Sequence, residues 1–133
     1  MPANRYELWR NVFRVKGIYN CVASLGLLLC DDRIRAYLGA EPGDPVYRTM
    51  FLALCFAFGL GYSAVSRDLT KNHAVVGMGI LGQLSVFVVT SWAISCKQPG
   101  LPVLYLLPAI VDLVFAAAFL MFAWQYPKSV QRE

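Results

Sequence analysis

The chain has 133 residues, the length of a single domain. Apolar residues make up 58% of it and charged residues only 15%, against about 45–50% and about 25% in soluble domains. The net charge is +4, but the basic residues flank apolar runs singly or in pairs, where they anchor helices at lipid headgroups. This pattern excludes a soluble domain and a nucleic-acid-binding surface, and it makes the lipid bilayer the first expected partner.

Four apolar runs follow one another along the chain. A hydrocarbon core of about 30 Å needs about 20 helical residues, and the runs predict membrane-spanning helices over residues 12–30, 49–66, 74–96 and 101–126. Helices are expected because each segment must satisfy its own backbone hydrogen bonds in lipid. The connections are short, so neighbouring helices are antiparallel. We therefore predict an all-α fold, in which residues 1–133 form a single four-helix transmembrane domain.

The first run has two special features. Its uncharged part, residues 17–30, is short, so we expect the helix to start near Val12 while Arg14 and Lys16 extend to the headgroups. Residues 31–39 begin with two aspartates and end with Gly39, which are helix start and stop signals. They predict a short helix lying in the interface before the second span.

The distribution of lysine and arginine predicts the orientation. The amino-terminal segment, the loop after the second span and the tail together hold eight of these residues, and the two other loops hold four. Cytoplasmic loops carry the excess of positive charge. Both termini are therefore expected in the cytoplasm.

Asp112 is the most informative residue, because it lies near the middle of the fourth span. An ionised carboxylate at that depth costs about 2.5–3.5 kcal/mol on insertion scales. Such a residue is either a functional group facing the bundle interior or a protonated acid that links helices by hydrogen bonds. Both interpretations remain open at the level of sequence.

Gln83 is the partner that depth suggests for Asp112. Counted from opposite faces, their helical positions add up to roughly the full thickness of the hydrocarbon core, so the two side chains should lie at one level. Thr90 lies on the same side of the third span as Gln83, while Asn20 and Ser24 make a polar stripe on the first. We therefore predict a polar seam of Asp112, Gln83, Thr90, Asn20 and Ser24.

Ala53, Ala57 and Gly61 recur at four-residue spacing in the second span. Small residues at this spacing allow helices to approach closely, so this helix-packing face contacts either another helix of the bundle or a neighbouring protein.

Cys30 ends the first span and Cys96 the third, both on the outer side, where a disulfide can form. The single histidine and the scattered cysteines match no metal-binding spacing, and no catalytic or cofactor motif is present. We expect neither a metal nor a cofactor.

Residues 59–62, 66–72 and 79–83 resemble a pattern in small bacterial four-span membrane proteins, loosely similar to the DoxX-like group. In such proteins a lysine often stands at the position of Gln83. The resemblance implies a bacterial inner-membrane location, and DoxX-like proteins are associated with quinone-linked oxidase complexes.

The sequence thus predicts a non-enzymatic accessory or structural subunit of a larger bacterial inner-membrane complex, because the loops are short and no catalytic set is present. Two alternatives remain. One is a small proton-coupled transporter that uses Asp112, and the other is a membrane enzyme acting on a lipid or quinone.

Overall fold

The computed structural model describes residues 3–39, 44–97 and 103–125. They form α1 (Ala3–Leu38), α2 (Pro45–Arg67), α3 (His73–Ser95) and α4 (Leu106–Gln125), with the 3₁₀ turn η1 (Val103–Tyr105) leading into α4. No strand occurs within these ranges. All four long helices contain a stretch long and apolar enough to cross a membrane. The predicted all-α membrane bundle of four spans is confirmed.

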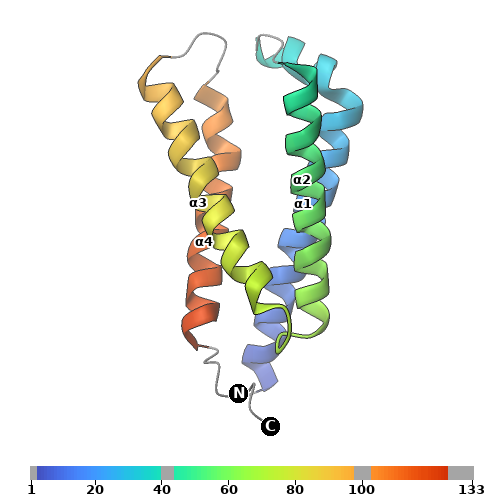
Figure 1. Ribbon diagram of the computed structural model, residues 1–133, viewed down its shortest axis with the longest axis vertical. Coiled ribbons are helices and arrows are strands. Elements are labelled where there is room, and N and C mark those ends of the chain that lie inside the picture. The colour runs from blue at the N-terminus through green and yellow to red at the C-terminus, as the bar shows by residue number, and fades with distance from the viewer. Residues whose placement is uncertain (1–2, 40–43, 98–102, 126–133) are drawn as a thin grey trace.

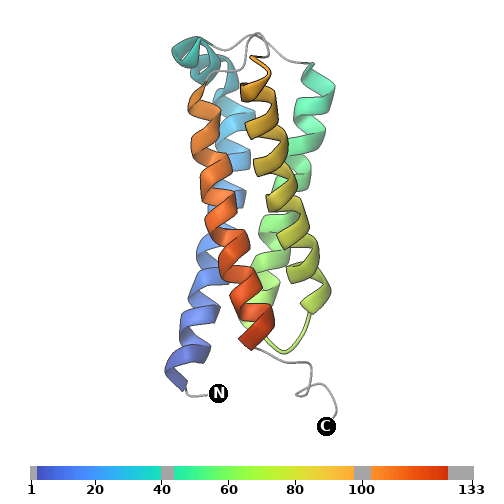
Figure 2. The ribbon, with the colours of Figure 1, turned by 90° about the vertical axis from the view of Figure 1, so that its left-hand side faces the viewer.

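The helices are arranged as two antiparallel hairpins (Figure 1). α1 packs along α2, and α3 packs along α4. We call the end of the bundle at which α1 begins the N-terminal end; it also holds residues 68–72 and the end of α4. The opposite end is the far end. The hairpins meet at the N-terminal end and diverge toward the far end (Figure 1), while all four helices follow one common axis (Figure 2).

α1 is longer at both ends than the sequence suggested. It begins at Ala3 and runs without a break to Leu38, so the short interfacial helix predicted over residues 31–39 is the end of α1 and not a separate element. No proline or glycine interrupts residues 27–38, and Gly39 ends the helix with a φ of +63°, a conformation that glycine adopts without steric cost. The predicted limits Leu101 and Tyr126 of the fourth span lie outside the described residues.

Local chemistry explains where the other helices begin. The Asp44 carboxylate accepts hydrogen bonds from the backbone N–H groups of Val46 at 2.8 Å and Tyr47 at 3.1 Å, so it caps α2, and Pro45 occupies the first turn. Pro108 likewise lies in the first turn of α4, where its missing N–H would have no partner in the helix.

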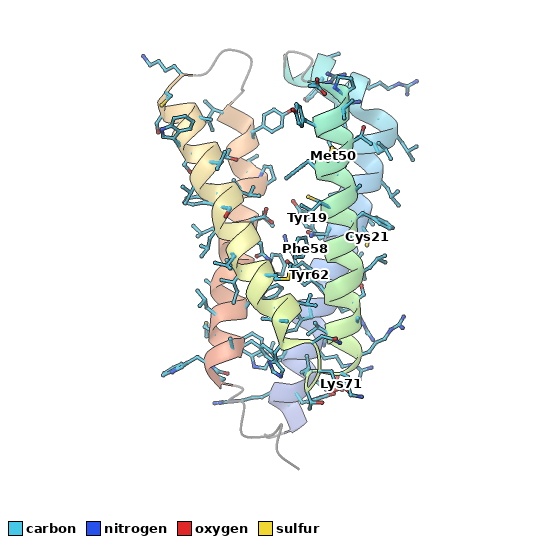
Figure 3. The ribbon with its side chains drawn as sticks, in the orientation of Figure 1. Tyr19, Cys21, Met50, Phe58, Tyr62 and Lys71 are labelled. Atoms are coloured by element: carbon cyan, nitrogen blue, oxygen red, sulfur yellow. The ribbon has the colours of Figure 1, made fainter. Side chains whose placement is uncertain are left out.

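The packed core lies at the N-terminal end and joins the two hairpins. The ring of Phe13 on α1 stacks on that of Phe119 on α4 at 4.5 Å and meets Phe122 edge-on at 4.9 Å. Tyr62 on α2 contacts Phe119 at 5.0 Å, and Figure 3 shows Tyr62 beside Phe58, between the two hairpins. The buried residues of this core are Trp9, Phe13, Tyr62, Val65, Leu69, Val76, Ile80, Phe119 and Phe122.

Candidate intramembrane ion-pair site

Lys16 and Asp112 form an ion pair between α1 and α4, and thus between the two hairpins. The Lys16 ammonium donates a hydrogen bond to Oδ1 of the Asp112 carboxylate. The Lys16 side chain is 1% exposed and the Asp112 side chain 20% exposed. Removing two charges from water is costly, and in the interior of a protein this cost is offset only by close pairing and further polar contacts.

Two aromatic rings complete the surroundings of the ammonium. Lys16 Nζ lies 4.9 Å from the centre of the Tyr19 ring and 5.0 Å from the centre of the Phe115 ring. A cation within about 6 Å of a ring centre is attracted by the negative face of the ring. The cation therefore has three favourable neighbours: one carboxylate and two rings.

The position of Lys16 differs from the sequence-based expectation. We expected its side chain to extend to the headgroups from the end of a helix starting near Val12. In the structure the membrane-crossing part of α1 is Asn4–Cys30, so Lys16 follows its first residue by 12 positions, or roughly 18 Å at helical rise. That position is the middle of the membrane-crossing part of α1, and from there the ammonium binds Asp112 instead.

Gln83 is not the partner of Asp112, which corrects the prediction from depth. Its amide nitrogen donates a hydrogen bond to the hydroxyl of Tyr62 on α2 at 3.0 Å. Gln83 is 5% exposed, and its carbonyl oxygen has no hydrogen-bond partner among the described residues. Position along the membrane normal was a poor guide because it ignores the direction in which each side chain leaves its helix.

The remaining residues of the predicted seam lie on other contacts. Asn20 donates to the backbone carbonyl of Cys55 at 3.4 Å, which ties α1 to α2, and Ser24 donates to the carbonyl of Asn20 at 2.6 Å. Thr90 is half-buried on α3. Gln83, Asn20 and Ser24 thus bond to groups other than Asp112.

The close approach of α1 and α2 depends on glycines. A β-carbon at Gly17 would lie 2.9 Å from the carbonyl oxygen of Gly59, and one at Gly59 would lie 2.9 Å from that of Gly17. The face of Ala53, Ala57 and Gly61 lies elsewhere on α2: both alanines are exposed, and Gly61 is half-buried. This face was predicted to contact either another helix of the bundle or a neighbouring protein. Within the bundle only Gly61 makes such a contact among these three residues, since a β-carbon added to it would lie 3.0 Å from Val75 of α3.

The cysteines and the potential metal ligands lie apart from one another. All four cysteines are free, and Cys30 and Cys96 are both exposed, so the disulfide between them stays a prediction. Within the described ranges, histidine, cysteine and acidic side chains form no group of three that could hold a metal ion.

The comparisons with known proteins give no family. No protein-family model, no curated protein and no solved structure matches this chain.

Lys16 and the two rings around it, those of Tyr19 and Phe115, were not predicted as site residues from the sequence, and a sequence signal existed only for Lys16. Its signal was the length of the first helix: Tyr6 and Trp9 are aromatic residues of the kind that mark a membrane interface, and they precede Val12. A helix starting before them places Lys16 halfway along the span, at a depth similar to that of Asp112.

Proposed function

We propose that this chain is a non-enzymatic accessory subunit that assembles with a larger complex in a bacterial inner membrane, with both termini in the cytoplasm. The polar chemistry of the bundle supports this role, because Lys16 and Asp112 neutralise each other inside the chain. The connection between α2 and α3 is also too short to form a binding domain of its own.

The observation that carries the proposal is the small-residue face of α2. α1 packs against α2 at Gly59, which leaves Ala53 and Ala57 exposed on another side of the same helix. In lipid, where no hydrophobic force drives helices together, small residues favour association by allowing close packing. This face is therefore the part of the surface best suited to a helix of a partner protein.

Copurification tests the proposal. Ala57→Leu should reduce the amount of partner recovered from native membranes in mild detergent, because the larger side chain separates the two backbones. Ala117→Leu on α4 is the matched control, since Ala117 is also an exposed alanine of a spanning helix. If wild-type protein is recovered without a stoichiometric partner, or if both variants retain the partner equally, the proposal is wrong.

A small proton-coupled carrier is the second candidate, and the ion pair favours it. Ionisable side chains within a membrane are often parts of ion or proton pathways. The packed aromatic core lies on the N-terminal side of the pair, and the helices of the two hairpins diverge on its other side (Figure 1). A carrier of this kind needs Lys16 and Asp112 as charged groups, while a subunit needs them only as a link between hairpins.

The two candidates are separated by the double variant Lys16→Met/Asp112→Leu, which removes both charges without leaving one unpaired. A subunit would still assemble with its partner. If the protein is a carrier, the double variant would fold but would lose the proton flux that the wild type supports in reconstituted vesicles. A proton flux that the wild type shows and the double variant lacks would favour the carrier. The absence of a proton flux in the wild type would exclude it.

A further inference from the structure

The surroundings of the Lys16 ammonium have the composition of an ammonium-binding site. Two ring faces, those of Tyr19 and Phe115, lie 4.9 and 5.0 Å from Nζ, and the Asp112 carboxylate supplies the opposite charge. Aromatic rings combined with an acidic group are a general means of recognising organic ammonium ions. In this structure the bound ammonium belongs to the chain itself.

This site adjoins the surface of the protein. Tyr19 is 36% exposed, and it also borders a shallow, open surface groove of about 410 Å³ that is lined by residues of α1 alone, namely Val15, Ile18, Tyr19, Val22 and Ala23. The other four lining residues are apolar. The Tyr19 side chain thus belongs both to the lining of the groove and to the ammonium site.

Depth determines which molecules can reach the groove. Lys16 and Tyr19 lie near the middle of the membrane-crossing part of α1, roughly 18 Å or more from its first residue. The headgroups of phospholipids lie outside the hydrocarbon core of about 30 Å, so they do not reach this level. An occupant must be dissolved in the hydrocarbon and must carry a small polar group.

We propose that this site binds a membrane-dissolved alkyl amine, whose chain occupies the groove and whose nitrogen takes the place of the Lys16 ammonium beside Asp112. The carboxylate and the two rings select a cation over an anion, and the apolar groove selects an alkyl chain. This inference is independent of the accessory role proposed above.

Charge balance sets the form in which the ligand enters. Two ammonium ions beside one carboxylate would leave an uncompensated charge in the bilayer, which is unfavourable. The ligand therefore arrives as the neutral amine and accepts a proton from Lys16 Nζ. It then pairs with Asp112 as an ammonium ion, and Lys16 remains as a neutral amine. The site keeps a net charge of zero throughout.

Thermal unfolding of the purified protein in a non-ionic detergent tests the proposal, with n-octylamine as the probe and n-octanol as a neutral probe of equal chain length. Octylamine should raise the unfolding temperature of the wild type in a concentration-dependent manner, and octanol should not. Equal shifts with both probes, or no shift with octylamine, would overturn the proposal.

Variants of the groove locate the binding. Ala23→Leu fills the groove, and Tyr19→Leu removes one ring of the cage, so each should weaken the response to octylamine by roughly tenfold. The matched controls are Ala117→Leu and Tyr37→Leu, which alter exposed residues of the same types elsewhere on the helices. An unchanged octylamine response in both groove variants contradicts the proposed site.

Chemical rescue provides a second measurement. Lys16→Ala deletes three carbons and the nitrogen, which correspond to n-propylamine. Propylamine should restore thermal stability to this variant, and n-propanol should not. If the variant folds and propylamine does not stabilise it, the cage is not an ammonium site. If the variant does not fold, the wild-type and groove measurements still decide.

Discussion

Lys16 and Asp112 depend on each other, so replacing one of them should affect the stability of the protein differently from replacing both. Removing one partner of a buried ion pair leaves an uncompensated charge, whereas replacing both with apolar side chains is often neutral or stabilising. The pair is therefore weak evidence for stability in itself. It is strong evidence that neither residue tolerates change alone.

Asp112→Asn should therefore destabilise the protein substantially, by roughly 3–5 kcal/mol, because the Lys16 ammonium remains buried without its counter-ion. Lys16→Met/Asp112→Leu should be close to the wild type in stability. Unfolding in detergent of the wild type, both single variants and the double variant measures the coupling between the residues. A mild effect of Asp112→Asn would mean that the two residues do not form a charged pair in the protein.

Asp68 follows α2 and stabilises the connection to α3. Its carboxylate accepts hydrogen bonds from the Thr70 hydroxyl at 2.6 Å and the Thr70 N–H at 3.0 Å, and it pairs with Lys71 at 3.0 Å. These bonds, first those from Thr70 and then that from Lys71, lower the pKa of Asp68 from 3.8 to about 2. Figure 3 shows Lys71 at this end of the bundle.

The sign of the pH dependence follows from the lowered pKa. Asp68 contributes stability above pH 3.8, its value in the unfolded chain, and this contribution is lost as the pH falls toward 2. Asp68→Ala should lower the unfolding temperature at pH 5 but not near pH 2. Lys71→Met should keep most of the dependence, because the Thr70 bonds contribute more than the lysine. A difference between wild type and Asp68→Ala that is constant over pH 2–5 would contradict this assignment.

At the scale of the elements, the contact between α1 and α2 is set by backbone packed on backbone. Gly17 and Gly59 meet with no room for a β-carbon on either residue. Gly26 also lies on α1, but a β-carbon added there would have no neighbouring atom within 4 Å. The backbones of α1 and α2 are therefore in close contact at the level of Gly17, which is next to Lys16 in the chain.

Gly17→Ala should destabilise the protein by about 1–3 kcal/mol, because the added methyl group forces the helices apart. Gly26→Ala should be neutral or stabilising by up to about 1 kcal/mol, since alanine is the better helix former and has space there. Denaturant unfolding of the two variants gives the comparison. Equal effects would show that α1 and α2 are not in close contact at Gly17.

For the whole molecule, the packing is uneven along the bundle axis. The buried core that joins the hairpins lies at the N-terminal end, and the hairpins diverge toward the far end. Relative movement of the hairpins is therefore expected to be easier at the far end, with the Lys16–Asp112 pair at the border between the two regions.

The orientation in the membrane is a further property of the whole molecule. We expect a reporter that is active only in the periplasm to give no signal when fused after Glu133. The same reporter fused after Lys97, at the far end of α3, should give a signal, because an odd number of spans precedes it. The reverse pattern would invert the orientation inferred from the distribution of lysine and arginine.

Sequence alone determined that this chain is a bundle of four membrane-crossing helices. The bilayer requires long apolar segments with internally satisfied backbones, and that requirement acts on each segment independently of its neighbours. The same local character made Asp112 recognisable as a buried acid, since its depth depends only on the span that contains it.

Only the tertiary structure decided which side chain neutralises Asp112. Its partner lies 96 residues away, and the pairing depends on the full length of α1, on the contact at Gly17 and Gly59, and on the approach of α1 to α4. Gln83 lay at a suitable depth but bonds to Tyr62 instead. Depth is a local property of one helix, whereas the facing of side chains arises from how helices rotate and cross, and these are settled only when the whole bundle packs.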